Sequence, residues 1–195
     1  MLDLTGKIAI VTGGASGIGR ETVLKLASKG AIIFSGDVDT IGNKETAKIA
    51  NDKNGIVHAL ELDITNNDSI ESFASSVVDQ NLGGRKPVDI IVNVAGWDKI
   101  QPFLDATPDF MDKVLSINLA GPINIIRYFL PEMIAVNQGK IVNISSDAGR
   151  VGSMGETIYS GAKGGIIAFT KSLARETARH TINVNCVCPG PTNTP

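Results

Sequence analysis

The sequence is poor in cysteine, histidine and aromatic residues. It has two cysteines, two histidines and 5% aromatic residues among 195 positions. Two cysteines do not make a disulfide framework, so we predict a reducing compartment, with the cytoplasm as the default location. A zinc site would need more ligands than His58 and His180, which lie far apart in the sequence, so no metal centre is expected.

An excess of one charge and long apolar runs are also lacking. The chain has 18 basic and 20 acidic side chains and a net charge of −2, with no basic block, which argues against nucleic-acid binding through a cationic face. No apolar run approaches about 18 residues, so no membrane span is expected. The first residues show no cationic segment followed by an apolar stretch, so no signal peptide is expected either.

The two cysteines, Cys186 and Cys188, stand two positions apart in a β-branched segment. On a strand both side chains would point to the same face, where the geometry is poor for a bond between them. We therefore interpret both as packing or surface positions.

The composition that remains is that of a folded globular protein. Hydrophobic residues make up 43% of the chain, which is too many for a disordered protein. The length favours one large domain, residues 1–195, over two full ones. The 21 glycines indicate tight turns or places where the backbone must approach another group closely.

Short β-branched runs alternate with segments of helical spacing. The runs are continuous rather than alternating, which is typical of strands buried in a parallel sheet. Strands are expected at 7–12, 31–35, 56–62, 88–94, 139–145 and 181–188. Helices are expected at 18–29, 40–53, 66–80, 108–136 and 157–179. This β-α-β-α pattern predicts an α/β fold with a doubly wound, Rossmann-like parallel sheet in three layers, and ligands at the carboxyl ends of the strands.

A glycine-rich turn follows the first expected strand. Gly13, Gly17 and Gly19 precede a helix, so a tight turn, an open backbone and a helix N-terminus are combined. Free N–H groups and the positive end of the helix dipole suit a pyrophosphate. An ATPase-type loop would end in Gly-Lys-Ser/Thr, but Arg20 and Glu21 follow instead. A glycine cluster by itself also marks ordinary turns, yet its place between strand and helix favours dinucleotide binding.

The second expected strand ends at Asp37, 18 residues after Gly19. An acidic residue about 20 positions after the glycines binds the ribose 2′-hydroxyl in dinucleotide sites. A carboxylate there repels a 2′-phosphate, and neither Val38 nor Ser16 offers a cation, so NAD is favoured over NADP. A simple turn aspartate is the alternative. Asp63 and Asn93 also occupy strand ends, where each alone would be read as a turn or cap residue.

Ser146, Tyr159 and Lys163 suggest a reacting site. Tyr159 and Lys163 are four positions apart near the start of a helix and therefore share one face. A nearby ammonium favours the phenolate and lowers the pKa of a tyrosine from about 10, giving a general base usable near neutral pH. Ser146, at a strand end, could orient an alcohol or carbonyl oxygen. Without this context, such a pair is usually an exposed helix face.

Three glycines in the same helix, Gly161, Gly164 and Gly165, are unfavourable there by about 1 kcal/mol each relative to alanine. Close approach by a cofactor or by a partner helix would offset this. A dimer packed through this helix is therefore one hypothesis.

Together these residues resemble the short-chain dehydrogenases/reductases over essentially the whole chain. The motif residues are Thr12, Gly13, Gly17, Gly19, Asn93, Ala95, Gly96, Asn118, Ser146, Tyr159, Lys163, Pro189 and Gly190. The family usually has a second asparagine where this chain has Val94, which predicts altered hydrogen bonding in that turn.

The resemblance implies a catalytic tetrad. Tyr159 would be the acid/base, and Lys163 would lower its pKa and bind the nicotinamide ribose. Ser146 would hold the substrate oxygen, and Asn118 would help to keep a water for a proton relay. The implied cofactor-binding residues are Gly13, Ser16, Gly17, Ile18, Gly19, Asp37, Asp63, Ile64, Asn93, Ala95, Gly96, Tyr159, Lys163, Pro189, Gly190 and Thr192. The family habit also implies a homotetramer or homodimer.

Two segments, 95–98 and 146–156, are similar to 2-hydroxycyclohexane-1-carboxyl-CoA dehydrogenases. This resemblance implies NAD-dependent oxidation of a ring alcohol beside a thioester, so an alcohol or ketone, such as an acyl-CoA, is the expected small-molecule partner. Trp97 could pack on a ring or only within its loop, and Arg150 could meet an anion or lie exposed. A 3-oxoacyl-thioester (acyl-carrier-protein) reductase and a non-catalytic NAD-binding sensor or interaction module remain alternatives.

Members of this family are usually longer than 195 residues. The resemblance therefore predicts that the substrate lid and the last edge strand are absent from this sequence, and that further residues follow Pro195 in the native chain. Strand 181–188 would then be an open edge, which is a liability in solution.

Overall fold

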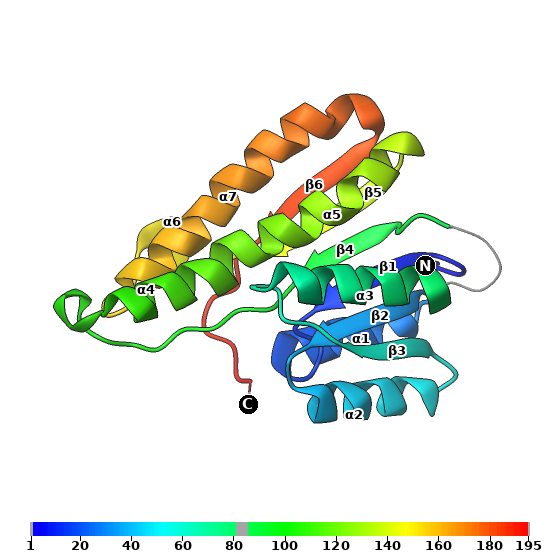
Figure 1. Ribbon diagram of the computed structural model, residues 1–195, viewed down its shortest axis with the longest axis horizontal. Coiled ribbons are helices and arrows are strands. Elements are labelled where there is room, and N and C mark those ends of the chain that lie inside the picture. The colour runs from blue at the N-terminus through cyan, green and yellow to red at the C-terminus, as the bar shows by residue number, and fades with distance from the viewer. Residues whose placement is uncertain (1, 81–85, 195) are drawn as a thin grey trace.

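The computed structural model describes residues 2–80 and 86–194. Six parallel strands form one sheet in the order β3-β2-β1-β4-β5-β6 (Figure 1). They are β1 (Ile8–Thr12), β2 (Ile32–Asp37), β3 (Ile56–Glu61), β4 (Ile90–Asn93), β5 (Gly139–Ile144) and β6 (Ile182–Val187). All six predicted strands are confirmed. The order reverses between β1 and β4, and the carboxyl ends of these strands form the switch point at which doubly wound sheets bind ligands.

Helices cover both faces of the sheet, as predicted. One layer contains α1 (Gly17–Ala27) and α2 (Thr40–Asn51), whose small and β-branched residues pack on Ala9, Val11 and Ile33. The opposite layer contains α3 (Asn67–Gln80), α5 (Gly121–Ala135) and α7 (Thr157–Thr177). These crossovers are right-handed by default, so helices before and after the switch point lie on opposite faces.

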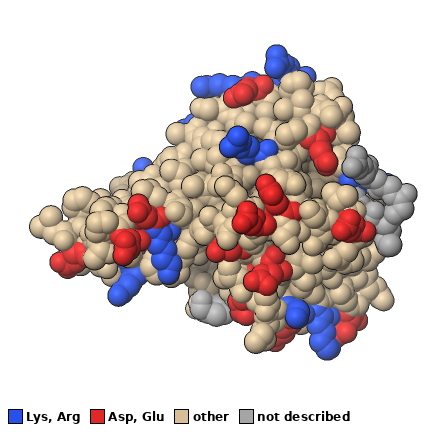
Figure 2. All heavy atoms as spheres, viewed as in Figure 1, with Lys and Arg blue, Asp and Glu red and all other residues tan. Residues whose placement is uncertain are grey.

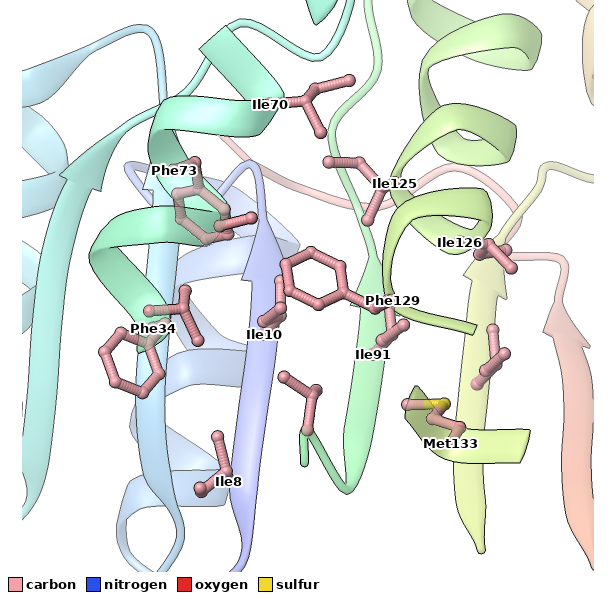
Figure 3. Packing of buried hydrophobic residues seen from close by; sticks show 14 of the residues in the cluster. Ile8, Ile10, Phe34, Ile70, Phe73, Ile91, Ile125, Ile126, Phe129 and Met133 are labelled. Atoms are coloured by element: carbon pink, nitrogen blue, oxygen red, sulfur yellow. The ribbon is translucent and has the colours of Figure 1, made fainter. Parts of the chain in front are cut away.

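The larger core lies under α3 and α5 (Figure 3). Phe73 of α3 and Phe129 of α5 face side chains of the central strands, including Ile10 and Ile91. All four side chains are almost completely removed from solvent. At about 25 cal/mol per Å² of apolar surface, such burial is the main force that holds the layers together.

The helix predicted over 108–136 is not continuous. It divides into α4 (Pro108–Leu115), a π-helical segment (Ser116–Ala120) and α5. Pro122 has no N–H to donate to the Asn118 carbonyl four residues earlier, and the Gly121 N–H instead bonds to the Ser116 carbonyl. A Cβ on Gly121 would lie 2.7 Å from Ile64. The absence of a side chain at Gly121 therefore lets the start of α5 approach the loop after β3.

Three short helical segments were not predicted. They are η1 (Phe103–Asp105), α6 (Ala148–Val151) and η3 (Ala178–His180). The first two lie in the loops that follow β4 and β5, on the same side of the sheet as the switch point (Figure 1). η3 ends α7 two residues earlier than the sequence suggested, and Thr181 in left-handed conformation turns the chain into β6.

Among the described residues, β6 pairs only with β5 and is an edge strand, as expected. No helix in ranges 2–80 and 86–194 is both long and apolar enough to cross a bilayer. On the face shown in Figure 2, acidic and basic side chains are interspersed rather than gathered by sign.

Candidate active site

A cleft of about 670 Å³ runs along the carboxyl ends of the strands. Its walls come from the glycine-rich loop at one end and from the start of α7 at the other. The predicted cofactor residues that line it are Gly13, Ser16, Gly17, Ile18, Gly19, Asp37, Asp63, Ile64, Ala95, Gly96, Tyr159, Lys163, Pro189, Gly190 and Thr192. The cleft therefore joins two groups of residues that the sequence had suggested separately.

The glycine-rich loop leaves no space for side chains. Gly13 has φ +76°, and a Cβ on it would lie 2.7 Å from the Ala95 nitrogen. A Cβ on Gly19 would lie 1.8 Å from the Gly13 carbonyl oxygen. Ser16 is the N-cap of α1, but its side chain makes no capping bond. The first N–H groups of α1 are thus available for an anion, and they carry the positive end of the helix dipole.

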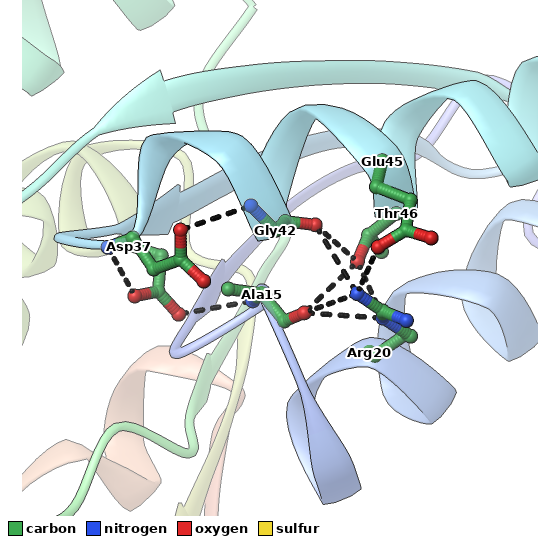
Figure 4. Close-up of polar contacts among 7 residues, drawn as sticks. Ala15, Arg20, Asp37, Gly42, Glu45 and Thr46 are labelled. Atoms are coloured by element: carbon green, nitrogen blue, oxygen red, sulfur yellow. Dashed lines mark hydrogen bonds and ion pairs between the residues drawn. The ribbon is translucent and has the colours of Figure 1, made fainter.

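Asp37 ties this loop to the end of β2 (Figure 4). Its carboxylate accepts hydrogen bonds from the backbone N–H groups of Ala15 and Asp39, each at 2.9 Å. The carboxylate lines the cleft, where an adenosine ribose would lie if the pyrophosphate occupied the loop.

Arg20 is a cation near the loop that the sequence reasoning did not weigh. Its guanidinium donates to the Ala15 carbonyl at 2.7 and 3.1 Å and pairs with Glu45 at 2.9 Å. It lies on the other side of Ala15 from Asp37 (Figure 4) and is not among the residues that line the cleft. These bonds hold the guanidinium against the loop backbone, so Arg20 supports the loop.

Asn93, one of the expected cofactor-binding residues, has a buried side chain. Asn93 is opposite Asn143 in the β4–β5 register, and its amide donates to the Asn143 side chain at 3.0 Å. Asn143 donates in turn to the Thr170 hydroxyl of α7 at 3.0 Å. All three residues are buried, and Asn93 does not line the cleft. Parallel pairing places both amides on one face, where the Asn93 nitrogen bonds to Asn143 and the Asn93 Oδ1 has no partner among the described residues.

Tyr159, Ser146 and Lys163 meet at the other end of the cleft. All three side chains line this part of the cleft. The Lys163 Nζ lies 5.5 Å from the centre of the Tyr159 ring and donates to the Ile144 carbonyl at 3.0 Å. The i, i+4 spacing on α7 brings the ring and the ammonium together, as predicted.

The pKa of Tyr159 is raised above its usual value, although the sequence led us to expect Lys163 to lower it. Burial is the largest cause; the hydrogen bond with Ser146 acts in the opposite direction, and the carboxylates of Glu156 and Asp98 raise the pKa further. Burial also lowers the pKa of Lys163 to about 8. The lysine is itself poorly solvated and turned towards Ile144, so the acids and burial dominate at the phenol.

Asn118 lies outside the cleft and is fully buried in the π-helical segment. Its amide nitrogen donates to the backbone carbonyls of Trp97 and Val114 at 2.6 and 2.9 Å, and its Oδ1 accepts from the Trp97 N–H at 3.2 Å. The side chain therefore holds both backbone groups of Trp97, and with them the loop that follows β4.

Trp97 lines the cleft, and the Lys113 ammonium lies 3.9 Å from the centre of its ring. The edge of Phe110 packs near the same ring at 5.8 Å between centroids. Arg150 instead pairs with Asp147 at 3.1 Å, and 61% of its side chain is exposed. Lys113 was missed because its nearness to Trp97 depends on how α4 packs; Arg150 has the exposed position that was one of its alternatives.

Comparison with known proteins decides the family. The family model described as short chain dehydrogenase matches residues 7–195. A 3-oxoacyl-[acyl-carrier-protein] reductase of Thermotoga maritima is 36% identical over 192 residues, or 98% of this chain and 76% of that protein. The chain belongs to the short-chain dehydrogenases.

Other relatives in this family act in different directions and on different substrates, as their names indicate. A 2,3-dihydroxy-2,3-dihydro-p-cumate dehydrogenase of Pseudomonas putida is 37% identical over 99% of this chain and 73% of its own. A solved actinorhodin polyketide ketoreductase with NADPH superposes with a TM-score of 0.92 at 32% identity, covering 97% of this chain and 72% of that one. The protein is thus an NAD(P)-dependent short-chain dehydrogenase/reductase that acts on CH–OH groups.

Two of the three glycines of α7 pack closely against other parts of the same chain. A Cβ on Gly164 would lie 3.3 Å from the Gly149 carbonyl, and one on Gly165 would lie 3.0 Å from Leu119. Only open space surrounds Gly161 within the described residues. Close packing of α6 and of the π-helical segment on α7 explains two of the three glycines, so they no longer argue for a partner helix.

Both cysteines of the dehydrogenase are free and partly exposed. Burial raises the pKa of the Cys186 thiol, and the nearby Cys188 raises it further. The two side chains do share one face, as predicted. In the described residues, no group of three or more histidine, cysteine or acidic side chains could hold a metal ion.

Proposed function

We propose that this dehydrogenase oxidises a secondary alcohol to a ketone with NAD⁺, on a cyclic hydroxyacyl thioester such as 2-hydroxycyclohexane-1-carboxyl-CoA. The observation that carries the proposal is that one cleft is lined by Asp37 at one end and by Tyr159, Ser146 and Lys163 at the other. Because both lie on one sheet, we further propose that residues 1–195 act as one cofactor-binding and catalytic domain.

Ser146 and Tyr159 act on the substrate oxygen. Ser146 donates a hydrogen bond that fixes this oxygen, and the Tyr159 phenolate takes the alcohol proton as the C–O bond becomes a carbonyl. The nicotinamide, when bound, supplies the chemistry by accepting the hydride from the carbinol carbon. One proton and one hydride leave the alcohol, so the balance is that of a two-electron oxidation.

Lys163 and Asn118 support these groups. Lys163 lines the cleft beneath Tyr159, where its ammonium can donate to the ribose hydroxyls while it stabilises the phenolate. Pro122 cannot donate to the Asn118 carbonyl, so that oxygen is suited to hold the water of a proton relay. The side chain of Asn118 has a positioning role through Trp97.

Asp37 supports NAD over NADP as the cofactor. Its carboxylate lines the cleft, and Arg20, a cation near the glycine-rich loop, is engaged by Ala15 and Glu45. A ribose diol can donate to this carboxylate, whereas a 2′-phosphate would meet like charge without a countercharge.

A 3-oxoacyl-thioester reductase is the second candidate. It is favoured by the identity to the Thermotoga maritima reductase. The same residues would run the reaction in reverse, with Tyr159 donating the proton. We also propose a homodimer or homotetramer; a monomeric mass in sedimentation at micromolar concentration would contradict it.

The decisive experiment measures cofactor reduction with cyclic and linear hydroxyacyl-CoAs, and the reverse reaction with 3-oxoacyl thioesters. We expect turnover of a cyclic hydroxyacyl-CoA with NAD⁺, and loss of at least about a thousandfold in Tyr159→Phe with little change in NAD⁺ affinity. A preference for linear 3-oxoacyl substrates selects the second candidate. Tight NAD⁺ binding without turnover of any alcohol would make the chain a sensor.

A further inference from the structure

Two carboxyl groups approach Tyr159 from different loops. Asp98 lies in the loop after β4, and Glu156 immediately precedes α7. Both line one small cavity together with Tyr159, Phe103 and Phe110. This cavity adjoins the substrate end of the main cleft through the tyrosine they share.

The backbone holds the two loops in register. The Gln101 N–H donates to the Gly155 carbonyl at 2.9 Å, which joins the Asp98 loop to the Glu156 loop. Gly155 has φ +78°, and a Cβ there would lie 2.8 Å from Ile100. The fully buried Asn118 fixes Trp97, the neighbour of Asp98, through both of its backbone groups. These contacts therefore hold the Asp98 and Glu156 loops in defined positions.

Neither carboxyl group forms an ion pair among the described residues. The Asp98 Oδ2 is buried and has no hydrogen-bond partner among the described residues. Glu156 occupies the N-cap position of α7, but its side chain makes no capping bond. A buried carboxylate oxygen without a partner is unfavourable. Its presence beside the catalytic tyrosine therefore points to a role at the substrate.

The negative charge of the pair reaches the reacting end of the site. Both acids raise the pKa of Tyr159, and Glu156 also raises the pKa of Asp98, on which burial is the larger influence. Lys163 is turned towards Ile144, and Lys113 lies on the Trp97 ring. Within residues 2–80 and 86–194, neither lysine forms an ion pair with Asp98 or Glu156, so the two carboxyl groups form an acidic wall.

We propose that Asp98 and Glu156 select substrates by charge: they admit a neutral thioester beside the reacting carbon and reject the free carboxylate of the same acid. This inference rests on the proposed oxidation of a hydroxyacyl thioester and adds which residues recognise the activated form. A free carboxylate would be the third negative charge in a poorly solvated pocket, whereas a thioester carries none.

The first test compares 2-hydroxycyclohexane-1-carboxylic acid with its N-acetylcysteamine thioester, which lacks the phosphates of CoA. We expect the wild type to prefer the thioester in kcat/KM, and Asp98→Asn to reduce that preference about tenfold or more by raising kcat/KM for the free acid. Glu156→Gln is expected to act in the same direction. Glu71→Gln, which removes an exposed acid on α3, is the matched control and leaves the preference unchanged. An unchanged preference in both site variants would overturn the proposal.

The second test needs no turnover and separates this inference from the proposed function. In a Tyr128→Phe background Tyr159 is the only tyrosine, so its phenolate absorbance can be titrated directly. Asp98→Asn and Glu156→Gln should each lower the pKa of Tyr159, and Glu71→Gln should not. If no hydroxyacyl substrate is oxidised but the titration shifts, the proposed function fails while the acidic wall stands. If the titration is unshifted in both variants, Asp98 and Glu156 do not act as an acidic wall beside Tyr159.

Discussion

The Lys163 ammonium donates a 3.0 Å hydrogen bond to the backbone carbonyl of Ile144, the last residue of β5. This bond anchors a nearly buried charge at the end of β5, 5.5 Å from the centre of the Tyr159 ring. The sheet therefore fixes the lysine, and α7 fixes the tyrosine relative to it. The ammonium is poorly solvated at this place, and burial of its charge lowers the stability of the folded protein.

Lys163→Met should abolish turnover and stabilise the protein at pH 7. Burial lowers the pKa of Lys163 from 10.5 to about 8, which corresponds to about 3 kcal/mol against the charged form. Methionine cannot donate to the Ile144 carbonyl, and the loss of that hydrogen bond reduces the expected gain in stability by about 1 kcal/mol. We expect an increase in Tm of roughly 3–8 °C in calorimetry.

The pH dependence of this stabilisation tests its cause. A lysine whose folded pKa is depressed binds fewer protons in the folded than in the unfolded state between about pH 8 and 10.5, so wild-type stability should rise across that window. The advantage of the methionine variant should shrink over the same range. A constant difference between the two proteins would assign the gain to packing instead.

Asn118→Asp should impair both stability and activity. The amide nitrogen of Asn118 donates to two backbone carbonyls, of Trp97 and Val114, and a carboxylate has no proton for either. A buried charge beside two carbonyls costs about 2–4 kcal/mol in unfolding free energy. Chemical denaturation measures this loss, and an equally stable variant would contradict the contacts described for Asn118.

Replacing a glycine of α7 and replacing a glycine of α6, which packs on α7, should have opposite effects on stability. Gly161→Ala meets only open space and should stabilise the protein by about 0.5–1 kcal/mol. Gly149→Ala would place a Cβ 2.7 Å from the Lys163 backbone and should destabilise it by about 1–3 kcal/mol. Thermal unfolding at several protein concentrations measures both. Concentration-dependent destabilisation by Gly161→Ala would instead reveal a partner at this helix face.

Replacement of Asp37 and Val38 should change the cofactor preference. Asp37→Ser with Val38→Arg removes the carboxylate from the cleft and adds a cation beside it, since both residues line that wall. We expect the ratio of kcat/KM for NADP⁺ over NAD⁺ to rise at least tenfold. Glu71→Gln, which removes an exposed acid on α3 that does not line the cleft, is the control. A wild type that already prefers NADP⁺ would overturn the role given to Asp37.

The strands, the principal helices and most cleft residues could be predicted because their signals are local. Continuous β-branched runs such as 7–12 indicate buried parallel strands, and right-handed crossovers then restrict the topology. Glycines 13 and 19 could be recognised because only a residue without a Cβ fits there. The spacing of Tyr159 and Lys163 places them on one helix face whatever the rest of the fold does.

The π-helical segment, the orientation of Asn93 and the environment of Tyr159 could not be predicted in this way. The amide of Asn93 turned to Asn143, a partner 50 residues away that only strand pairing brings close. The raised pKa of Tyr159 depends on Asp98 and Glu156, which reach it through contacts between two loops.

The sequence alone thus determined the layers, the family resemblance and the residues of the cleft, because each is encoded by periodicity or by short spacings along the chain. Only the tertiary structure decided which charges surround Tyr159 and which side chains turn away from the cleft. Electrostatic and hydrogen-bond environments depend on distances between groups remote in sequence, and folding alone sets those distances.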